Sequence, residues 1–181
     1  MKFNTVSMVK HPLAQVWTLM RDDLPKLADQ MEDIKQIRVE SAHHNHNFHR
    51  IVNIWEASVQ LPFNVANPLG GDLLSWTDYA EWYDAERECR WHIEHHYFRD
   101  SFSCSGTTQF RPAMGGRGTR IVFSGTFDLN KKKIPKVLSI LEEPALKMIE
   151  SMLIKMIPKN FQKITDAMGN YLTLCGSEAV G

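Results

Sequence analysis

The sequence predicts an α+β fold in which one antiparallel sheet is covered by a long helix near the C-terminal end. Between residues 34 and 130, segments with a hydrophobic period of two alternate with turns. From Ile134 to about Leu172, apolar residues recur every three or four positions, as on one face of a helix. Most connections between the predicted strands are too short for parallel crossovers, so we expect an antiparallel sheet.

The N-terminal part predicts one strand followed by two short helices. Residues 2–10, KFNTVSMVK, have the length and the β-branched content of a strand. His11-Pro12 ends this strand, and proline fits the first turn of a helix. The next residues, PLAQVWTLM, have helical spacing, and residues 24–31, LPKLADQM, predict a second short helix.

Six further strands complete a predicted sheet of seven. They are expected at residues 34–42, 47–61, 76–84, 88–98, 101–112 and 119–130. A turn at residues 43–46 joins the first two of them, and MGGRG at 114–118 joins the last two. Residues 62–74 contain two prolines and a Gly-Gly pair, which predicts a long loop.

The C-terminal helix contains two prolines that interrupt its pattern. Proline is tolerated at a helix start but costs about 3 kcal/mol or more in a helix interior. We therefore expect a break near Pro144, and a kink or a break at Pro158, beyond which the apolar stripe continues. A curved sheet that covers one amphipathic helix often leaves room between the two.

Three stretches resemble a known superfamily. HPLAQVWTLMRD resembles the start of its first helix, RWHIEHHYFRDSFSCSGTTQFRP with GTRIVFSGTFDL resembles its central strands, and MIPKNFQKITDAMGNYL resembles its C-terminal helix. The superfamily is the START/polyketide-cyclase-like group (SRPBCC), which includes the birch-pollen-allergen type. The resemblance implies a helix-grip fold: a curved seven-stranded antiparallel sheet around a long C-terminal helix, with two short helices between the first two strands.

The same resemblance implies one domain over residues 1–181, with a hydrophobic ligand cavity between sheet and helix. The superfamily includes lipid and hormone carriers and aromatase/cyclases, and it has no universal catalytic motif. No cofactor is expected, because GGRG at residues 115–118 lacks the spacing and the following helix of a phosphate-binding loop.

The composition argues against two classes of partner, nucleic acids and the membrane interior. Lys and Arg total 21, as do Asp and Glu, so the formal net charge is zero, which argues against a nucleic-acid partner. No apolar run approaches the roughly 20 residues that an integral membrane segment needs, and the N-terminus does not resemble a signal peptide. The three cysteines form no CxxC pair, so we expect a cytoplasmic protein. We expect it to be a monomer or a homodimer.

The histidine-rich stretch CRWHIEHHYF, residues 89–98, is explained by strand alternation. One face would carry Trp91, Ile93, His95 and Tyr97, and the other would carry Arg90, His92, Glu94 and His96. The first set is apolar apart from His95, so it should face the core, and the second should face water. His95 is either a hydrogen-bonded core group or a polar anchor for a ligand.

No metal site is predicted. The Cα atoms of His92 and His96 would lie about 13 Å apart at roughly 3.3 Å per residue, too far for side chains that must converge to zinc–nitrogen bonds of about 2.0–2.1 Å. AHHNHNFH at residues 42–49 reads as an exposed polar turn, although its histidines could chelate adventitious nickel or zinc.

The predicted ligand-binding residues come from three predicted strands and from the helix. They are Trp55, Trp91, Ile93, His95, Tyr97, Phe123, Phe127, Met148, Met152 and Met156. The three methionines have i, i+4 spacing, which also fits plain core packing. The segment WTDYAEWYD is ambiguous, because Trp76 and Trp82 alternate with Tyr79 and Tyr83.

Three functional hypotheses follow. The leading one is binding of a small hydrophobic ligand, such as a lipid, polyketide or aromatic metabolite, between sheet and helix. The second is an enzyme of the cyclase/dehydratase type, with His95 as acid/base and Tyr97 as a donor. The third is a non-catalytic interaction module that uses exposed aromatics around Trp76–Trp82 as a dimer surface.

Overall fold

The computed structural model describes residues 1–45, 48–58, 75–97, 99, 101–130 and 143–178, without the side chains of residues 102, 129, 143–158, 177 and 178. Its elements, in chain order, are β1 (Lys2–Val9), α1 (Leu13–Asp22), the 3₁₀ helix η1 (Leu24–Gln30), β2 (Ile34–His44), β3 (His49–Ala57), β4 (Ser75–Tyr83), β5 (Glu88–His95), β6 (Phe102–Ala113), the 3₁₀ turn η3 (Met114–Gly116), β7 (Gly118–Leu129) and α3 (Glu143–Glu178).

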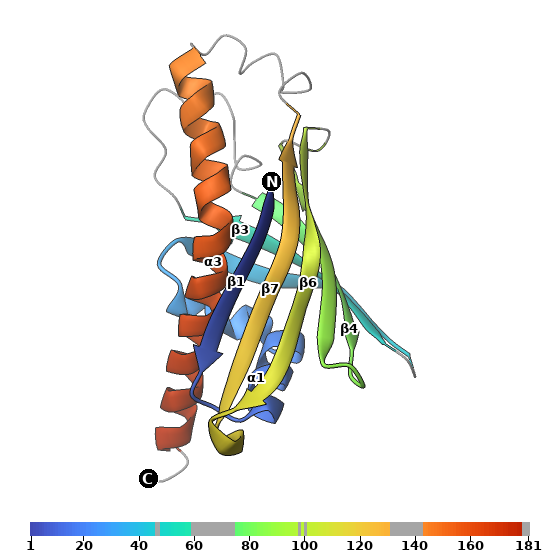
Figure 1. The fold of residues 1–181 in the computed structure, drawn as a ribbon, viewed down its shortest axis with the longest axis vertical. Helices are drawn as coiled ribbons and strands as arrows, with labels where there is room; N and C mark the ends of the chain where they lie inside the picture. Colours follow the sequence, from blue (N-terminus) through green and yellow to red (C-terminus); the bar gives the residue numbers. More distant parts are fainter. Residues whose placement is uncertain (46–47, 59–74, 98, 100, 131–142, 179–181) are drawn as a thin grey trace.

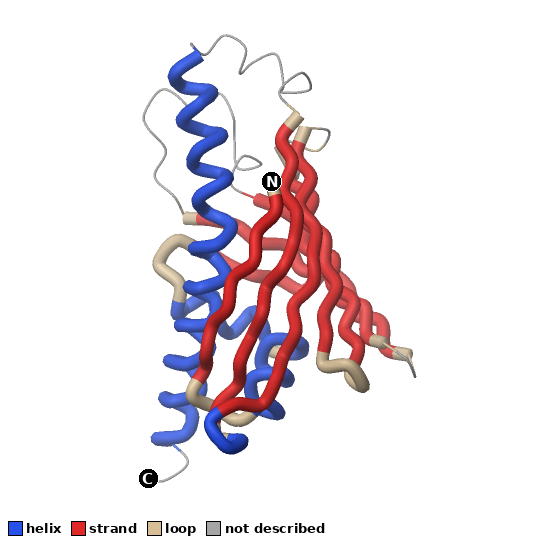
Figure 2. The backbone as a smooth tube through the Cα atoms, viewed as in Figure 1, coloured by secondary structure: helices blue, strands red, loops and turns tan. Residues whose placement is uncertain are grey.

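The strands form one seven-stranded sheet in the order β1-β7-β6-β5-β4-β3-β2. Every neighbouring pair is antiparallel, which confirms the predicted α+β class and the predicted sheet. Figure 1 shows the sheet strongly bent, with α3 running along it and α1 near the C-terminal end of that helix. Figure 2 separates the strand layer from the helices that pack against it.

The C-terminal helix differs from its prediction at one proline. Pro144 is the second residue of α3, a position where the missing N–H costs little. The helix continues through Pro158 without interruption, so the alternative of a break there is wrong. Residues 134–142, also predicted as helix, lie outside the described residues. Among the described helices, none is long and apolar enough to cross a bilayer.

Helix α3 is held mainly against β1 and η1 (Figure 1). Ser7 on β1 donates a hydrogen bond to Gln162 over 3.0 Å, and Lys163 pairs with Asp33, which directly precedes β2. Apolar side chains of the same helix enter the core, among them Ile164 and Met168. This buried face offsets the local cost of Pro158.

Near the C-terminal end of α3, the core is built from α1 and the sheet (Figure 1). The helical spacing predicted for this segment is confirmed, because Val16, Trp17, Leu19 and Met20 are all buried. The indole of Trp17 meets the rings of Trp82 and Phe110 edge-on, each at a centroid distance of 5.1 Å. This end of the inner face is therefore closed by aromatic packing.

Two glycines make room for a tryptophan in the middle of the sheet. Gly106 on β6 is paired with Gly125 on β7, and with Trp91 on β5. A Cβ atom on Gly106 would lie 2.1 Å from the Ser124 backbone oxygen and 2.8 Å from the Trp91 ring. The two strands approach closely here only because these positions have no side chain.

Candidate functional site

The inner face of β3, β4 and β5 carries a row of three side chains that contains an acid. Asp78 on β4 lies opposite Asn53 on β3 and opposite Ile93 on β5. We call these three residues the Asp78 row. Asn53 is buried, whereas Asp78 and Ile93 retain part of their accessible surface. A partly accessible pair on the core-facing side indicates that this part of the inner face is not fully covered.

The next row toward the start of β4 is aromatic. Trp76 lies opposite Trp55 on β3 and opposite His95 on β5, and these three residues form the Trp76 row. The rings of Trp55 and Trp76 stack at a centroid distance of 5.7 Å and an interplanar angle of 16°. Because side chains two residues apart share a face of a strand, the Trp76 row borders the Asp78 row.

Burial raises the pKa of Asp78 from 3.8 to about 7, and a hydrogen bond from the Asn53 side chain acts in the opposite direction. No Lys or Arg side chain within the described ranges pairs with this carboxyl. Its charge also acts on two buried thiols. Burial first, and then Asp78, raises the pKa of Cys89 well above its usual value and the pKa of Cys104 to about 12. A carboxyl that titrates near neutrality without a cation is unusual for an inner sheet face.

Two further polar atoms next to this carboxyl lack partners. The Asn53 side-chain oxygen and the Trp55 indole nitrogen are both buried and have no hydrogen-bond partner among the described residues. Buried polar atoms are normally satisfied, and leaving one unpaired costs about 1–3 kcal/mol. A donor of a bound molecule would satisfy the Asn53 oxygen, and an acceptor would satisfy the Trp55 indole N–H.

Two of the predicted wall residues are instead covered by the helix. Phe161 on α3 stacks on Phe123 with a centroid distance of 4.2 Å and also packs against Trp91 at 5.5 Å. The indole nitrogen of Trp91 donates to Thr108 over 3.0 Å. Phe161 therefore covers Trp91 and Phe123, while Trp55, Ile93 and His95 lie in the Asp78 row or in the adjacent one.

His95 is buried at 6% exposure, as predicted for the inner face. Its ring nitrogen Nδ1 accepts a hydrogen bond of 3.2 Å from the backbone N–H of Tyr97, so a neutral His95 carries its proton on Nε2. Strand β5 ends at His95 rather than at residue 98. The alternation that placed Tyr97 on the inner face therefore does not extend to it. Phe127 on β7 is buried and lies opposite Cys104 on β6, which in turn lies opposite Ile93.

His96 does not point freely to water as the strand pattern predicted. Its two ring nitrogens lie 2.8 Å from the Ser75 hydroxyl and 2.7 Å from the Thr77 hydroxyl. Both hydroxyls are on β4, and both residues are buried. The chain turns after His95, which brings His96 back onto its neighbouring strand. The rest of that face is as predicted, since Arg90, His92 and Glu94 are exposed.

The two tryptophans do not belong to the exposed aromatic surface predicted around Trp76–Trp82, and a dimer surface at this segment stays a prediction. Trp82 is 3% exposed, and Trp76 is half-buried in the Trp76 row. The register assigns both tryptophans to the inner face and Tyr79 and Tyr83 to the outer one. The side chains of Met148, Met152 and Met156 lie outside the described residues, and the backbone places all three within α3.

Solved structures resemble this arrangement over nearly the whole chain. An aromatase/cyclase from Streptomyces sp. R1128 superposes with a TM-score of 0.67 and 13% identity, covering 94% of this chain and 92% of its own. A START superfamily protein from Mycobacterium smegmatis gives 0.55 and 11%, with coverage of 96% and 98%. For norcoclaurine synthase from Thalictrum flavum the values are 0.55 and 12%, with coverage of 96% and 86%.

The protein has the helix-grip fold. The resemblance to START/polyketide-cyclase-like proteins is thereby confirmed at the level of the fold. No protein-family profile and no curated protein sequence matches the chain.

Asp78 and Asn53 are the residues of this helix-grip sheet that sequence reasoning missed. The segment WTDYAEWYD has aromatic residues on both alternating faces, so its own pattern could not identify the inner one. A usable signal was present in its neighbours: Asn53 lies on the same predicted face of its strand as Trp55, and a polar residue there has to find a partner across the strand.

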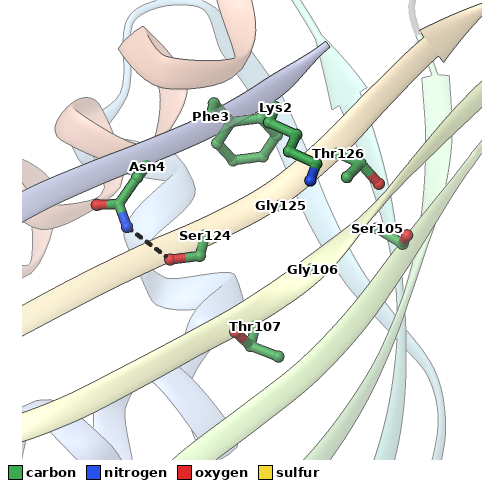
Figure 3. A pocket seen from close by; sticks show the side chains of 9 residues that line it. All are labelled: Lys2, Phe3, Asn4, Ser105, Gly106, Thr107, Ser124, Gly125 and Thr126. Carbon is green, nitrogen blue, oxygen red and sulfur yellow. Dashed lines mark hydrogen bonds between the residues drawn. The ribbon is translucent and has the colours of Figure 1, made fainter.

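The outer face of the helix-grip sheet carries a separate hollow of about 610 Å³. Figure 3 shows its polar wall, which includes Lys2, Asn4, Ser124 and Thr126 over the glycine pair of β6 and β7. Lys2, Asn4 and Thr126 are exposed to solvent. The polar side chains of its wall lie on the opposite face of the sheet from the Asp78 row, whereas Phe3, which also lines it, stacks on Trp91.

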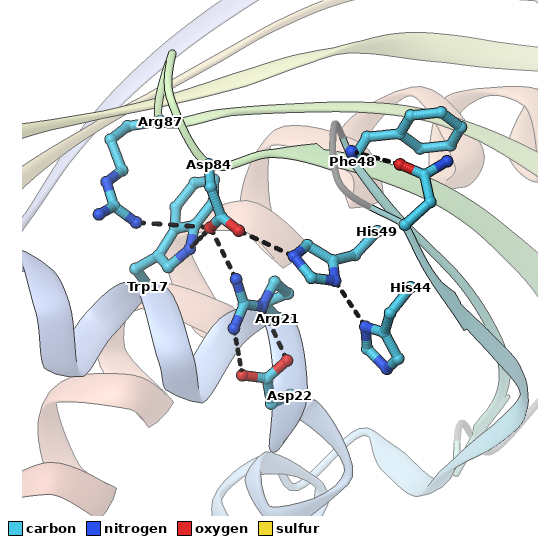
Figure 4. Close-up of polar contacts among 9 residues, drawn as sticks. Trp17, Arg21, Asp22, His44, Phe48, His49, Asp84 and Arg87 are labelled. Atoms are coloured by element: carbon cyan, nitrogen blue, oxygen red, sulfur yellow. Dashed lines mark hydrogen bonds and ion pairs between the residues drawn. The ribbon is translucent and has the colours of Figure 1, made fainter.

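A second polar cluster joins the strand ends to α1 around Asp84 (Figure 4). The Asp84 carboxylate accepts hydrogen bonds from Trp17 at 2.8 Å and Arg21 at 2.6 Å. It also lies 2.8 Å from His49 Nε2, and His49 Nδ1 lies 2.5 Å from His44 Nδ1. Partial burial acts to raise the pKa of Asp84, but the bonds from His49 and Trp17 and the charge of Arg21 outweigh it and hold that pKa below its usual range.

We expect Asp84→Ala to lower the free energy of unfolding by about 2 kcal/mol, because hydrogen bonds to a charged group are worth more than neutral ones. The exposure of Asp84 limits the loss. Urea unfolding would measure it, with Asp22→Ala as the control. Asp22 pairs with the same arginine but holds neither Trp17 nor His49, so its loss should stay below about 0.5 kcal/mol. Equal losses in the two variants would contradict a role for Asp84 as the centre of the cluster.

Proposed function

We propose that the protein binds a small, mainly hydrophobic ligand on the inner face of β3, β4 and β5, with its polar group at Asp78 and Asn53. The observation that carries this proposal is the Asp78 carboxyl, partly accessible on an apolar and aromatic face and without a basic partner among the described residues. Placing a carboxyl in such a position costs free energy that packing alone does not recover, and such groups cluster at functional sites.

The surroundings of Asp78 fit a ligand pocket. Trp55, Ile93, His95 and Phe127 supply apolar surface with one titratable group, and binding sites are typically apolar with a few placed polar groups. Trp91 and Phe123, which Phe161 covers, form the closed part of the same face. The wall formed by Met148, Met152 and Met156 remains a prediction.

We expect Ile93→Trp to fill the space beside Asp78 and to weaken uptake of the uncharged dye Nile red at least about tenfold, the effect of losing roughly 1.4 kcal/mol of binding free energy. Fluorescence titration would measure the affinity, and circular dichroism would verify that the variant is folded. The control is Val6→Trp, which adds the same ring at an exposed position of β1. The proposal fails if the wild-type protein takes up no dye, or if folded Ile93→Trp binds it as the wild type does.

A second candidate is an enzyme that moves a proton in the same pocket. It is favoured by a carboxyl whose pKa lies near 7, because a catalytic acid or base works best near the operating pH. His95, in the adjacent row, remains the other candidate, with Tyr97 next to it. Two of the solved neighbours are enzymes by name, an aromatase/cyclase and norcoclaurine synthase. In this case the rate would follow an ionisation near pH 7 that disappears in Asp78→Asn.

A further inference from the structure

The Asp78 row, at the centre of the inner face, is rich in acceptors, whereas the indole N–H of Trp55, a donor without a partner in the described part of the chain, lies in the adjacent row. An ionised Asp78 offers only acceptor positions, and Asn53 satisfies one of them with its side-chain N–H. The Asn53 oxygen is a second acceptor, buried and without a donor among the described residues. On the other flanks, Ile93 lies opposite Asp78, and Ala80 and Trp76 are its neighbours two residues away on β4. None of these three offers a charged donor.

Among the described residues, no positive charge lies at the same centre. Asn53 on β3 and Ile93 on β5 lie opposite Asp78. The titratable groups that the structure describes further away on the same face are His95 one row along β5, Cys104 on β6 opposite Ile93, and Cys89 near the start of β5. The two thiols stay neutral, because burial, and then the charge of Asp78, raises the pKa of each of them. His95 lies one row away and already accepts a hydrogen bond at Nδ1. An ionised Asp78 therefore has no lysine or arginine partner in the described part of the chain.

Beside this acceptor-rich centre stands an aromatic pair. Trp55 and Trp76 stack in the adjacent row, about 7 Å further along the strands at roughly 3.3 Å per residue. Aromatic faces attract organic cations at distances up to about 6 Å from the ring centre. They also stack with flat apolar rings.

We propose that the ligand of this pocket carries a protonated amine, whose N–H groups bond to the Asp78 carboxylate and the Asn53 oxygen while its apolar part packs on the Trp76 row. The inference rests on the proposed function, because it specifies the polar group of the same ligand. An ammonium group provides several donors together with a positive charge, and no Lys or Arg among the described residues provides that charge to Asp78. A hydroxyl provides a single donor and no charge, and a carbonyl provides neither.

The test compares two probes that differ only in the polar group: 2-(1-naphthyl)ethylamine and 2-(1-naphthyl)ethanol, titrated calorimetrically at pH 8. We expect the amine to bind at least about tenfold more tightly, because its charge-assisted hydrogen bonds are stronger than neutral ones. The advantage should shrink at pH 5.5, since Asp78, with a pKa of about 7, is then protonated while the amine stays charged. It should also fall to about twofold or less in Asp78→Asn.

Asp128→Asn is the matched control, because it removes the same charge from an exposed position on β7. This variant should keep the preference for the amine. Equal affinity of the two probes, or a preference that survives Asp78→Asn, would overturn the amine inference and leave the proposed function standing. If neither probe binds the wild-type protein, the proposed function fails, and the inference fails with it.

Discussion

Asp78→Asn is expected to raise the free energy of unfolding at pH 8 by up to about 4 kcal/mol, given about 1.4 kcal/mol per tenfold difference in proton affinity. The carboxyl has a pKa of about 7 in the folded protein against an ordinary 3.8, so its ionisation at pH 8 opposes folding. The amide is nearly isosteric and uncharged, and its oxygen can still accept the hydrogen bond from Asn53. Urea unfolding of both proteins at pH 8 would measure the difference.

The same change has a characteristic pH dependence. Between about pH 4 and pH 7 the folded wild type holds a proton on Asp78 that the unfolded chain has lost, so stability falls as the pH rises. Asp78→Asn removes this slope, and the two proteins should approach equal stability near pH 4. Asp84 acts in the opposite sense: its pKa is lowered, so the stability that it contributes is present above about pH 4 and is lost in stronger acid. That acid loss should remain in Asp78→Asn.

Asp128→Asn again serves as the control, because an exposed carboxylate on β7 should leave both the stability and its slope nearly unchanged. A wild-type protein equally stable from pH 4.5 to pH 8 would show that Asp78 titrates normally. It would also remove the energetic argument for a pocket there. If the expected gain is found, the fold keeps an ionisable Asp78 at a cost in stability, which is the usual trade-off at functional sites.

Strand alternation was enough to predict most of the inner face but could not identify its centre. Trp91 and His95 are buried, and His92 and Glu94 exposed, as the period of two requires. The same rule treats a carboxylate as a solvent-facing group, so it gave no reason to place Asp78 inside. Its face is determined by register with two other strands, which bring Asn53 and Ile93 opposite it. Register depends on pairings distant in sequence.

Two local predictions failed because a partner distant in sequence decided the geometry. His96 continues the polar face by alternation, but hydroxyls on β4 bind both of its ring nitrogens once β5 has ended. Pro158 favours a break in an isolated helix, yet α3 continues through it, and the residues beyond it pack into the core. In both cases tertiary contacts outweigh a local preference of a few kcal/mol.

Gly106→Ala is expected to destabilise the fold by about 3 kcal/mol or more, at the upper end of the usual cost of overpacking. The added methyl would lie 2.1 Å from the Ser124 backbone oxygen, 2.8 Å from the Gly125 Cα and 2.8 Å from the Trp91 ring. Two of these neighbours are backbone atoms of β7 held by the sheet, and the third is a buried indole. None of them can move aside without breaking strand pairing or the contact between Trp91 and Phe161.

The control makes the same chemical change at Gly169 in α3, where a methyl group meets nothing within 4 Å. Gly169→Ala should stabilise the protein by about 0.5–1 kcal/mol, because alanine loses less backbone entropy than glycine in a helix. Urea unfolding should therefore give shifts of opposite sign for the two variants. If Gly106→Ala were as stable as the wild type, β6 and β7 would be further apart than the structure has them. The packing of Trp91 over the glycine pair would then be open rather than closed.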